Sequence, residues 1–533
     1  MKKIICMLLA VVLVFGLVAC GGKTAPAENP EASNTETPGD SSVEPKGSSE
    51  GSPVSARDTL NVAISGDNGT LLPTKIWGNF IGIVRSYMEV LLDYIDGDLV
   101  WVLATGIDQV TPTQWTIHLR EGVTFSNGNP FNAEDVMFTL QYYLSEPMVA
   151  SYLNCIDLEN TKIIDDYTIE LALTHYAMQQ LGSFSMVYMF DKESFDADDF
   201  VTHPIGTGPY VVTEYTINSH VYMERNDNYW GDKAIIKNLH FKVFNEDAQI
   251  VNAIQSGTVD ISAVPAQDIE FVKTLPNYQL TEYYSQYAAN LSFNLTPESP
   301  LHDLDARLAV CYATNRSAMV DLAFFGSADV VNLPVSAHCY DYYPELDNQH
   351  DVYATGFNVE KAKELAEKSG LVGKTLHAIT NGTSTYVTIA EILQTNLRDI
   401  GVTLEIENYD NATYMANSYD PTKFDIAIYG IASPQGFAAA MLYEYVLWGE
   451  PIYKDWEGYS KLVELGAEAV GNSDEASRKD QLLEMVKLFE EGCPWYAICD
   501  QKNSLAINKD IAGISLSIVG GGTLSYYKCY WVK

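Results

Sequence analysis

The sequence predicts a mixed α/β protein whose folded part consists of two lobes. Predicted strands and helices alternate in at least two separate blocks, which is typical of sheets covered by helices. Hydrophobic residues make up 47% and charged residues 19% of the 533 residues, so the chain has enough apolar side chains to form folded cores. We first consider the N-terminal segments and then the elements of the folded part in order.

The N-terminus is typical of a secretory signal. Lys2 and Lys3 precede an almost unbroken apolar run over residues 4–18, which is short for a helix that spans a bilayer. The run ends in Leu17-Val18-Ala19-Cys20, which resembles the bacterial lipobox, where the peptide is cut before the cysteine and the thiol carries lipid. We expect a lipoprotein signal peptide over residues 1–19 and a palmitate-bearing lipid on Cys20. An ordinary secretory signal or a single anchor helix is the alternative.

A polar segment follows the predicted lipidation site. Residues 21–57 are mostly Gly, Ser, Thr, Pro, Glu and Asn, and such a segment cannot bury enough apolar surface to offset its ordering entropy. We therefore expect a disordered tether over residues 20–57, with the lipidated cysteine at its start. No later stretch approaches the roughly 18 continuous apolar residues of a membrane-spanning helix.

The first block of the folded part begins with a predicted strand over residues 60–64, which ends in the turn Ser65-Gly66-Asp67-Asn68-Gly69. A helix is predicted over residues 133–145. Asn132 is suited to cap this helix, and Asp135 at the third helical position would complete a capping box.

The later blocks repeat the alternation of strands and helices. A strand over residues 239–244, a helix over 247–256 that Gly257 ends, and a strand over 259–263 form a β-α-β unit. The remaining predicted elements are a helix over 359–369 capped by Asn358, a strand over 375–380, a helix over 386–400, strands over 402–407 and 424–429, and a helix from Ser473 to Gly492.

Composition and motifs exclude several classes of function. Lys and Arg number 32 against 70 Asp and Glu, a net charge of -38, which argues against nucleic-acid binding. The sequence contains no C-x-x-C, and its nine His residues include no pair four residues apart, so we expect no metal site. Its G-x-S-x-G match, at residues 47–51, lies in the polar segment rather than on a strand-to-helix turn, and the sequence lacks H-E-x-x-H and G-x-G-x-x-G, so we expect no enzyme and no cofactor.

Several segments resemble one family of proteins. Residues 115–125 and 127–136 are similar to the hallmark segment of the peptide/nickel class of solute-binding proteins that serve bacterial ABC importers, known as extracellular solute-binding family 5. Further segments agree in the order of the family: 204–210, 224–231, 256–261, 307–316 and 358–365. We expect the glycines of 204–210 to allow a tight crossing of the chain near a lobe junction, and Trp230 to pack in a core.

The resemblance implies a type II periplasmic-binding-protein fold, with two lobes joined by a two-strand hinge. Residues 58–95, 206–285 and 495–533 would form the core of lobe I, with residues 96–205 as an extra inserted region. Residues 286–494 would form lobe II.

The resemblance also implies the function of a membrane-tethered receptor. It would capture a peptide or peptide-like solute in the cleft between the lobes and deliver it to the permease. The expected partners are this small-molecule or short-peptide ligand, the ABC permease and ATPase subunits, and the cell membrane through lipid on Cys20 at its extracytoplasmic face. We expect a monomer that binds no nucleic acid.

By the same resemblance, three segments line the cleft: the turn after the first strand, the segment after the hinge, and the loop after strand 424–429. They nominate as ligand-binding residues Asn68, Trp77, Tyr287, Asn290, Ser433, Gln435 and Phe437. Aromatic side chains at such positions supply stacking area together with a polar group.

One departure from the family bears on the ligand. Peptide-binding members carry a Gly-Trp-x-x-Asp pattern, whose Asp pairs with the free amino terminus of the peptide. Here Gly430 is followed by Ile431, and the Asp position falls on Ser433 or Pro434, neither of which carries a charge. The hypothesis is a ligand that is amino-blocked, uncharged at that end, or not a peptide. The alternatives are an oligosaccharide, an amino-acid derivative or a metal chelate, or a sensor without transport.

Overall fold

The computed structural model describes residues 54–533 except 77–79, 96–97, 148, 178–179, 334, 347–350, 433–436 and 518–522; the side chains of 285, 286, 412 and 432 are not described. The predicted signal peptide, Cys20 and most of the predicted tether therefore lie outside the described residues. Residues 52–533 form one compact unit. None of the helices in the described part of the chain is long and apolar enough to cross a membrane.

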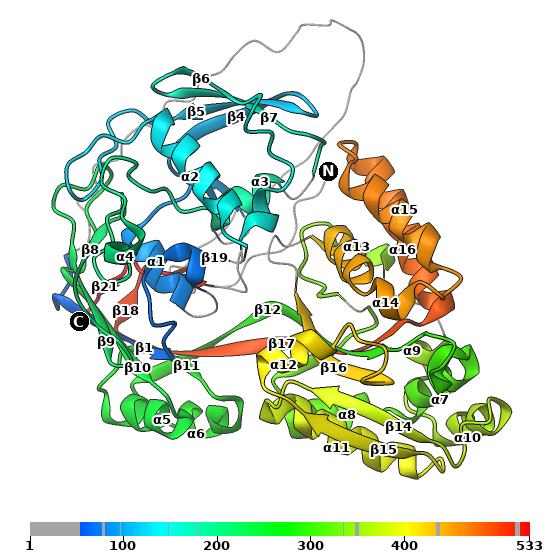
Figure 1. Cartoon of the computed structure of the whole chain (residues 1–533). Coiled ribbons are helices and arrows are strands. Elements are labelled where there is room, and N and C mark those ends of the chain that lie inside the picture. Colours follow the sequence, from blue (N-terminus) through cyan, green and yellow to red (C-terminus); the bar gives the residue numbers. More distant parts are fainter. Residues whose placement is uncertain are drawn as a thin grey trace, which may run out of the picture. The chain divides into compact units, whose positions relative to one another are not determined.

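A mixed sheet of eleven strands runs through the described body (Figure 1). Its order is β15 (Thr403–Asn408), β14 (Thr375–Thr380), β16 (Ile426–Ala432), β12 (Tyr278–Phe293), β17 (Trp495–Asn508), β11 (Ile261–Val264), β1 (Thr59–Ser65), β10 (Asn238–Phe244), β9 (His220–Arg225) and β8 (Tyr210–Thr216), with β13 (Ala328–Val330) paired to β17. The long strands β12 and β17 lie at its centre and belong to both halves of the sheet.

Three smaller sheets accompany the large one. One has the order β20 (Thr523–Ser525), β19 (Ser515–Ser517), β2 (Leu92–Ile95) and β3 (Asp98–Trp101). Another has the order β4 (Ala104–Thr111), β5 (Gln114–Leu119), β7 (Thr168–Ala172) and β6 (Lys162–Asp165), and the third pairs β18 (Ile511–Ala512) with β21 (Tyr530–Trp531).

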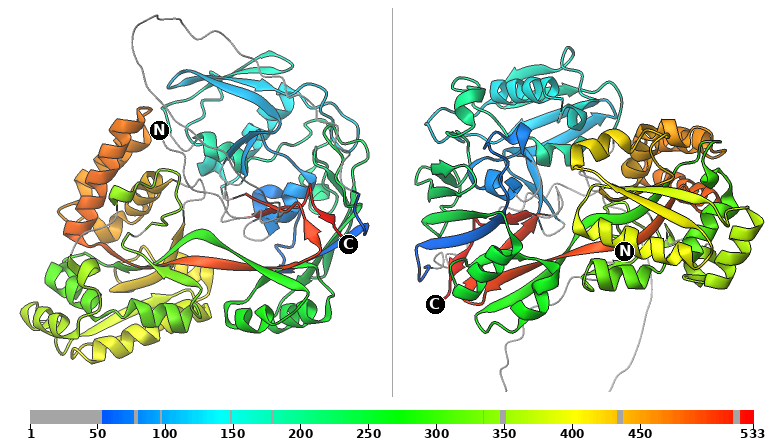
Figure 2. Two further views of the ribbon diagram at one scale, coloured as in Figure 1. Left: turned by 180° about the vertical axis from the view of Figure 1, so that it is seen from behind. Right: turned by 60° about the horizontal axis from the view of Figure 1, so that its bottom comes forward.

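Helices cover these sheets (Figures 1 and 2). Before β12 they are α1 (Ile81–Tyr87), α2 (Ala133–Ser145), α3 (Gln180–Ser183), α4 (Ala197–Phe200), α5 (Asp247–Ser256) and α6 (Ile269–Lys273). After β12 they are α7 (Leu304–Ala313), α8 (Arg316–Ala323), α9 (Asp351–Thr355), α10 (Val359–Lys368), α11 (Ser384–Arg398), α12 (Asn411–Asn417), α13 (Ala438–Trp448), α14 (Glu450–Tyr453), α15 (Tyr459–Val470) and α16 (Glu475–Gly492). Short 3-10 turns are Pro73–Lys75, Ala150–Leu153, Phe184–Met186, Ala266–Asp268, Pro300–His302 and Pro344–Leu346.

The apolar side chains form two large cores. The first core contains residues between 60 and 261 and between 505 and 531, joined by Ala440 and Val470. The second core contains residues between 289 and 499. A small cluster between α5, α6 and the neighbouring strands lies beside the first core. The two large cores are the structural counterpart of the two predicted lobes.

Many predicted elements are confirmed because local chemistry determines them. Asn132 accepts a hydrogen bond from Glu134 N, and Asp135 accepts one from Asn132 N, which completes the predicted capping box of α2. Gly257 ends α5 with φ of 69°, a left-handed conformation that glycine adopts without strain. The helix predicted from Ser473 to Gly492 starts two residues later: α16 begins at Glu475 after the cap residue Asp474, whose carboxylate accepts from Ser477 N at 2.8 Å.

The predicted tight crossing of the chain at 206–208 is confirmed. A β-carbon added to Gly206 would lie 2.1 Å from Tyr87 O, and one added to Gly208 would lie 2.5 Å from Tyr87 C. Gly208 N also donates to Tyr87 O at 3.1 Å. The crossing lies in the first core, where Tyr87 is buried, rather than where the two cores meet.

Candidate functional site

Strands β12 and β17 connect the two cores. Leu291 and Phe293 of β12 pack in the second core, whereas Tyr278 at the other end packs in the small cluster beside the first. In β17, Trp495 packs in the second core and Ile507 in the first. The two strands pair antiparallel from Tyr278 opposite Asn508 to Ser292 opposite Trp495. Two strands are thus the shared element on which one core can rotate against the other.

The pairing of β12 and β17 is interrupted between Tyr284 and Ala288. Polar contacts brace the chain at this irregularity. Lys502 Nζ lies 2.8 Å from the Asp329 carboxylate, which also accepts from Tyr284 Oη. The ring of His338 stacks on Tyr284 with centroids 3.7 Å apart. These contacts connect both linking strands to β13 and to the segment that follows it.

Aromatic side chains from both parts of the molecule meet in a cluster that we call the junction: Tyr94, Tyr340 and Phe437. Tyr94 of β2 and Tyr340 have ring centroids 4.8 Å apart, and Tyr340 and Phe437 have centroids 5.4 Å apart. Phe437 packs against both cores. Tyr340 Oη is buried and has no hydrogen-bond partner among the described residues.

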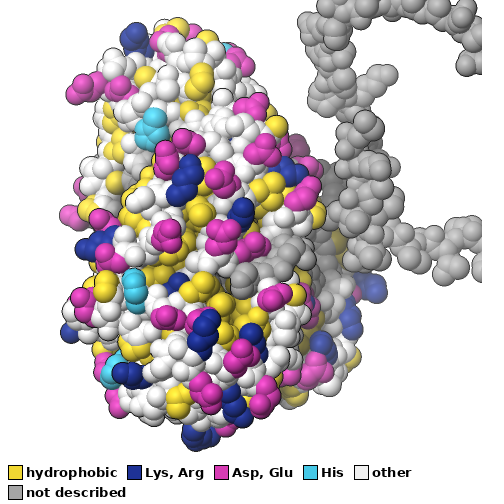
Figure 3. All heavy atoms as spheres, turned by 90° about the vertical axis from the view of Figure 1, so that its right-hand side faces the viewer, with side chains coloured by type: hydrophobic (Ala, Val, Ile, Leu, Met, Phe, Trp, Pro, Cys, Tyr) yellow, Lys and Arg dark blue, Asp and Glu magenta, His cyan; other side chains and the backbone are white. Residues whose placement is uncertain are grey.

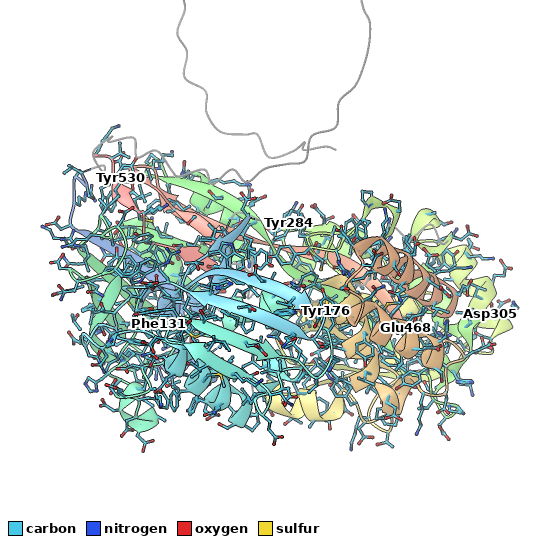
Figure 4. The ribbon with its side chains drawn as sticks, turned by 90° about the horizontal axis from the view of Figure 1, so that it is seen from above. Phe131, Tyr176, Tyr284, Asp305, Glu468 and Tyr530 are labelled. Atoms are coloured by element: carbon cyan, nitrogen blue, oxygen red, sulfur yellow. The ribbon has the colours of Figure 1, made fainter. Side chains whose placement is uncertain are left out.

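A second contact between the two parts involves Tyr176, which packs against both cores. Figure 4 shows it between the strands of the first part and the helices α15 and α16. The carbonyl of Tyr176 lies near Gly471, at the end of α15. The described body therefore presents apolar and aromatic surface where its two cores meet.

The structure places the predicted ligand residues in different surroundings. Asn68 is half-buried in the turn after β1, where the Asp67 carboxylate accepts from Gly69 N at 2.7 Å. Phe437 is the N-terminal cap residue of α13 and belongs to the junction. Trp77, Ser433 and Gln435 lie outside the described residues.

Tyr287 and Asn290 lie on β12, where they pair with Ala432 and Tyr429 of β16. Tyr287 is 43% exposed, so its ring is accessible. Asn290 is fully buried, and its Nδ2 donates to Ala288 O at 2.8 Å. Asn290 is thus enclosed in the sheet, whereas the Tyr287 side chain is partly exposed.

Sequence reasoning missed two residues next to Tyr287. A β-carbon on Gly430 would lie 2.3 Å from Tyr386 Oη and 3.4 Å from Tyr287 Cδ1. Gln501 Nε2 donates to Tyr386 Oη at 3.1 Å. Tyr386 lies near the start of α11 and Gln501 lies on β17. These residues are far apart in sequence, so no local pattern indicates that they meet at Gly430.

A cavity of about 640 Å³ lies beside α1 and the hairpin of β2 and β3. Its described lining includes Glu89, Tyr229 and Trp230. Tyr229 Oη donates to Glu89 at 2.6 Å, and Trp230 Nε1 donates to it at 2.8 Å. Burial raises the pKa of Glu89 to about 7, although these two hydrogen bonds favour the charged form.

The prediction that Trp230 packs in a core is therefore only partly right. Its ring is half-buried, packs against the first core on one side and lines the cavity on the other. The guanidinium of Arg120 lies 5.0 Å from its ring centroid. Asp227 and Asn228, which precede it by three and two positions, are exposed, and their polarity is the signal in the sequence that this segment lies near the surface.

An ion pair lies between the cavity and the junction. Arg85 of α1 and Asp93 of β2 are bonded through Nη1, and each side chain is 8% exposed. Asp93 also accepts from Tyr94 N at 2.7 Å and from Ser517 Oγ at 3.0 Å. Burial lowers the pKa of Arg85, but the Asp93 carboxylate and the Tyr188 hydroxyl together outweigh this effect, and the net pKa is raised.

No group of three or more His, Cys, Asp and Glu side chains in the described part of the chain is arranged to hold a metal ion. On the face shown in Figure 3, acidic and basic side chains are interspersed. The cysteines of the described residues are unpaired and buried: Cys155, Cys311, Cys339, Cys493, Cys499 and Cys529.

Comparison with known sequences gives one matching family. The model described as bacterial extracellular solute-binding proteins, family 5 Middle, matches residues 99–450. The chain is 24% identical over 389 residues to the nickel-binding periplasmic protein of Escherichia coli K12, which covers 69% of this chain and 74% of the relative. It is 22% identical over 450 residues to the peptide transport periplasmic protein SapA of Salmonella typhimurium, covering 77% and 80%.

Solved structures share the fold at low identity. NikA from Brucella suis, in complex with Fe(III)-EDTA, superposes with a TM-score of 0.79 at 18% identity, covering 89% of this chain and 99% of that one. DppA from Helicobacter pylori, in complex with the peptide STSA, gives a TM-score of 0.72 at 19% identity, covering 89% and 98%.

Proposed function

Since the chain belongs to the bacterial extracellular solute-binding proteins of family 5, we propose that it is the receptor of an ABC importer that captures its solute between the two lobes. The predicted fold class is confirmed, and the family is one of binding proteins rather than enzymes. The solute would be a peptide or a peptide-like compound, which the receptor delivers to the permease.

One observation carries this proposal: β12 and β17 link two separate cores, and aromatic side chains of both parts meet at the junction. A two-strand link permits rotation of one lobe against the other by small changes of backbone angles. Closure around a solute would place its surface against Tyr94, Tyr340 and Phe437 and exclude water from it. Tyr287, with its exposed ring, and Tyr386 and Gln501 next to Gly430 would extend this surface.

The N-terminal segments supply the location. A lipid on Cys20 would hold the receptor at the extracytoplasmic face of the cell membrane, and residues 21–57 would act as the tether. The tether raises the effective concentration of the receptor near the permease and its ATPase subunits. A single chain carries both lobes, so a monomer is sufficient for capture.

The solute class is proposed from the segment after Gly430. Ser433 and Pro434 stand where peptide-binding members carry an acidic residue, so a free ammonium group would lack its usual partner there. A solute that is amino-blocked, uncharged at that end or not a peptide fits this sequence. The similar chains include a nickel-binding protein and a peptide transport protein, so both kinds of cargo occur among them.

The test begins with the full chain purified in mild detergent from its native membrane. Mass spectrometry of the solute released on denaturation identifies the cargo, and a thermal shift on adding it back measures binding. Tyr340→Ala removes the central ring of the junction and should weaken binding at least tenfold, by the loss of about 1.5 kcal/mol or more of stacking and burial. Tyr343→Ala, a half-buried tyrosine that faces Lys479 instead, is the matched control. Equal affinity in the two variants would show that the solute binds elsewhere.

A further inference from the structure

We infer that the cavity beside α1 is a second binding site, in which Arg85 holds the carboxylate of a small aromatic acid. Every described lining residue of the cavity lies before residue 233 or after residue 524. The junction proposed for the transported solute needs Tyr340 and Phe437 of the other part of the chain. The inference therefore goes beyond the proposed function and does not depend on the identity of the transported solute.

The guanidinium of Arg85 carries the argument. Its Nη1 bonds to Asp93, but Nε and Nη2 are buried and have no acceptor among the described residues. Nε–H and Nη2–H point in parallel from one edge of the guanidinium, the edge that holds a carboxylate through two parallel hydrogen bonds. Burying these two charged donors with only the neutral Tyr188 hydroxyl nearby costs free energy, which a bound carboxylate would offset.

Tyr188 supplies a third donor at the same place. Its Oη is buried beside the Arg85 guanidinium, and Tyr188 lines the cavity together with Arg85. The hydroxyl is close enough to the guanidinium for a hydrogen bond between them to contribute to the pKa shifts of both groups. A carboxylate on the free edge of Arg85 would thus lie within the surroundings of this hydroxyl.

The charge around the cavity permits an anion. Arg85, Arg120 and Lys528 line it, as do Glu89, Asp93 and Asp232. Asp93 is already paired with Arg85, and Asp232 is exposed to solvent. With a pKa of about 7, Glu89 is partly neutral near neutral pH. The lining therefore contains no excess of buried negative charge that would repel a carboxylate.

The side chains that line the cavity indicate which group the ligand carries besides its carboxylate. Trp101, Trp230 and Tyr527 line it and are half-buried, so parts of their rings face the cavity. Flat apolar groups gain contact area and favourable ring geometry against such walls. A volume of about 640 Å³ lies within the range of small-molecule sites, and it admits a one- or two-ring acid.

The experiment compares acids with their amides on the full chain in detergent. Titration calorimetry with phenylacetate and indole-3-acetate is set against phenylacetamide and indole-3-acetamide, which have the same shape but lack the charge. We expect the acids to bind and the amides to bind at least about tenfold more weakly, because an amide NH₂ would face the two N–H donors of Arg85.

Two variants assign the binding to this site. Arg85→Lys keeps a cation beside Asp93 but lacks the two-nitrogen edge, so the affinity for the acids should fall about tenfold or more. Tyr188→Phe removes only a hydroxyl and should lower it severalfold, on the order of 1 kcal/mol. Tyr496→Phe is the matched control, since Tyr496 Oη is also buried without a partner among the described residues but lies in the second core.

The outcomes separate clearly. Absence of acid binding up to millimolar concentration, equal affinity for acids and amides, or full affinity in both Arg85→Lys and Tyr188→Phe overturns the inference. If Arg85→Lys does not fold, Tyr188→Phe and the amide comparison decide. The proposed function stands or falls separately, because the solute released from the native protein should still raise the melting temperature of Arg85→Lys and lose affinity in Tyr340→Ala.

Discussion

Gly208 illustrates how a single residue fixes the path of the chain in the first core. Replacing it by Ala would place a β-carbon 2.5 Å from the backbone of Tyr87, which cannot move without displacing the end of α1. We expect Gly208→Ala to destabilise the protein by about 3 kcal/mol or more. Thermal unfolding checks this, with Gly106→Ala as the control because a β-carbon there meets nothing within 4 Å. Equal melting temperatures for the two variants would contradict the close crossing.

Glu89 makes stability depend on pH. Its pKa is raised from 4.5 to about 7 by burial, so folding favours the protonated form. The stability that this group contributes is present below about pH 4.5 and is lost as the pH rises through about 7, a change on the order of 3 kcal/mol.

Glu89→Gln removes this titration. The urea midpoint of the wild type should fall between pH 5 and pH 7.5, and the fall should be smaller in the variant. The exposed Glu224 serves as the control, since Glu224→Gln should retain the wild-type dependence. The assignment fails if Glu89→Gln and the wild type lose stability in parallel over this range.

At the residue scale, sequence patterns predicted what local chemistry decides. The capping box at Asn132 and Asp135 follows from side chains that bond to neighbouring backbone. The free guanidinium edge of Arg85 and the bonds of Glu89 to Tyr229 and Trp230 were not predictable, because they depend on residues distant in sequence.

At the scale of elements, the helices and strands that have clear end signals were predicted from the sequence. Their observed bounds differ from the predicted ones by a few residues. The strand expected over 424–429 forms over Ile426–Ala432, and that expected over 259–263 forms over Ile261–Val264. The full extent of β12 was not predictable, since Tyr278–Phe293 contains polar and apolar residues without one regular alternation. The pairing of β12 is irregular at Tyr284, and the strand passes from one core to the other. Its buried face therefore changes along its length, and apolar and polar residues do not alternate regularly.

The packing of α7 against the end of α16 can be tested chemically. Cys311 Sγ and Cys493 Sγ lie 3.6 Å apart, and both side chains are buried. We expect diamide to oxidise this pair, with the two thiols losing two electrons and two protons to the diamide and forming one S–S bond. Peptide mass spectrometry should identify a Cys311–Cys493 cross-link, and Cys311→Ala should abolish it. Cross-linking of Cys493 to a different cysteine in the native protein would contradict the packing.

At the scale of the whole molecule, the sequence predicted the fold class because segments that resemble the family occur along most of the chain in the family's order. The site was less predictable. The junction joins Tyr94, which precedes the inserted strands, to Tyr340 and Phe437, which lie far along the chain. Of the predicted ligand residues, Phe437 belongs to this junction and Tyr287 lies at the surface beside Gly430, while Asn290 is buried in the sheet. Which of these side chains are buried and which are exposed depends on the tertiary fold, and no local pattern indicates it.

The central claim is that the solute is captured by closure of the two lobes about β12 and β17. Single-molecule energy transfer tests it most directly, with dyes on Asn160→Cys and Glu364→Cys, two exposed positions in different parts of the body. The native cysteines of the described residues are buried, so the dyes should label the introduced ones.

We predict that the solute released from the native protein changes the transfer efficiency in one step, that dialysis reverses the change, and that Tyr340→Ala shifts it to at least tenfold higher solute concentration, as expected for the loss of about 1.5 kcal/mol. A solute that raises the melting temperature without changing the transfer efficiency would contradict capture by closure.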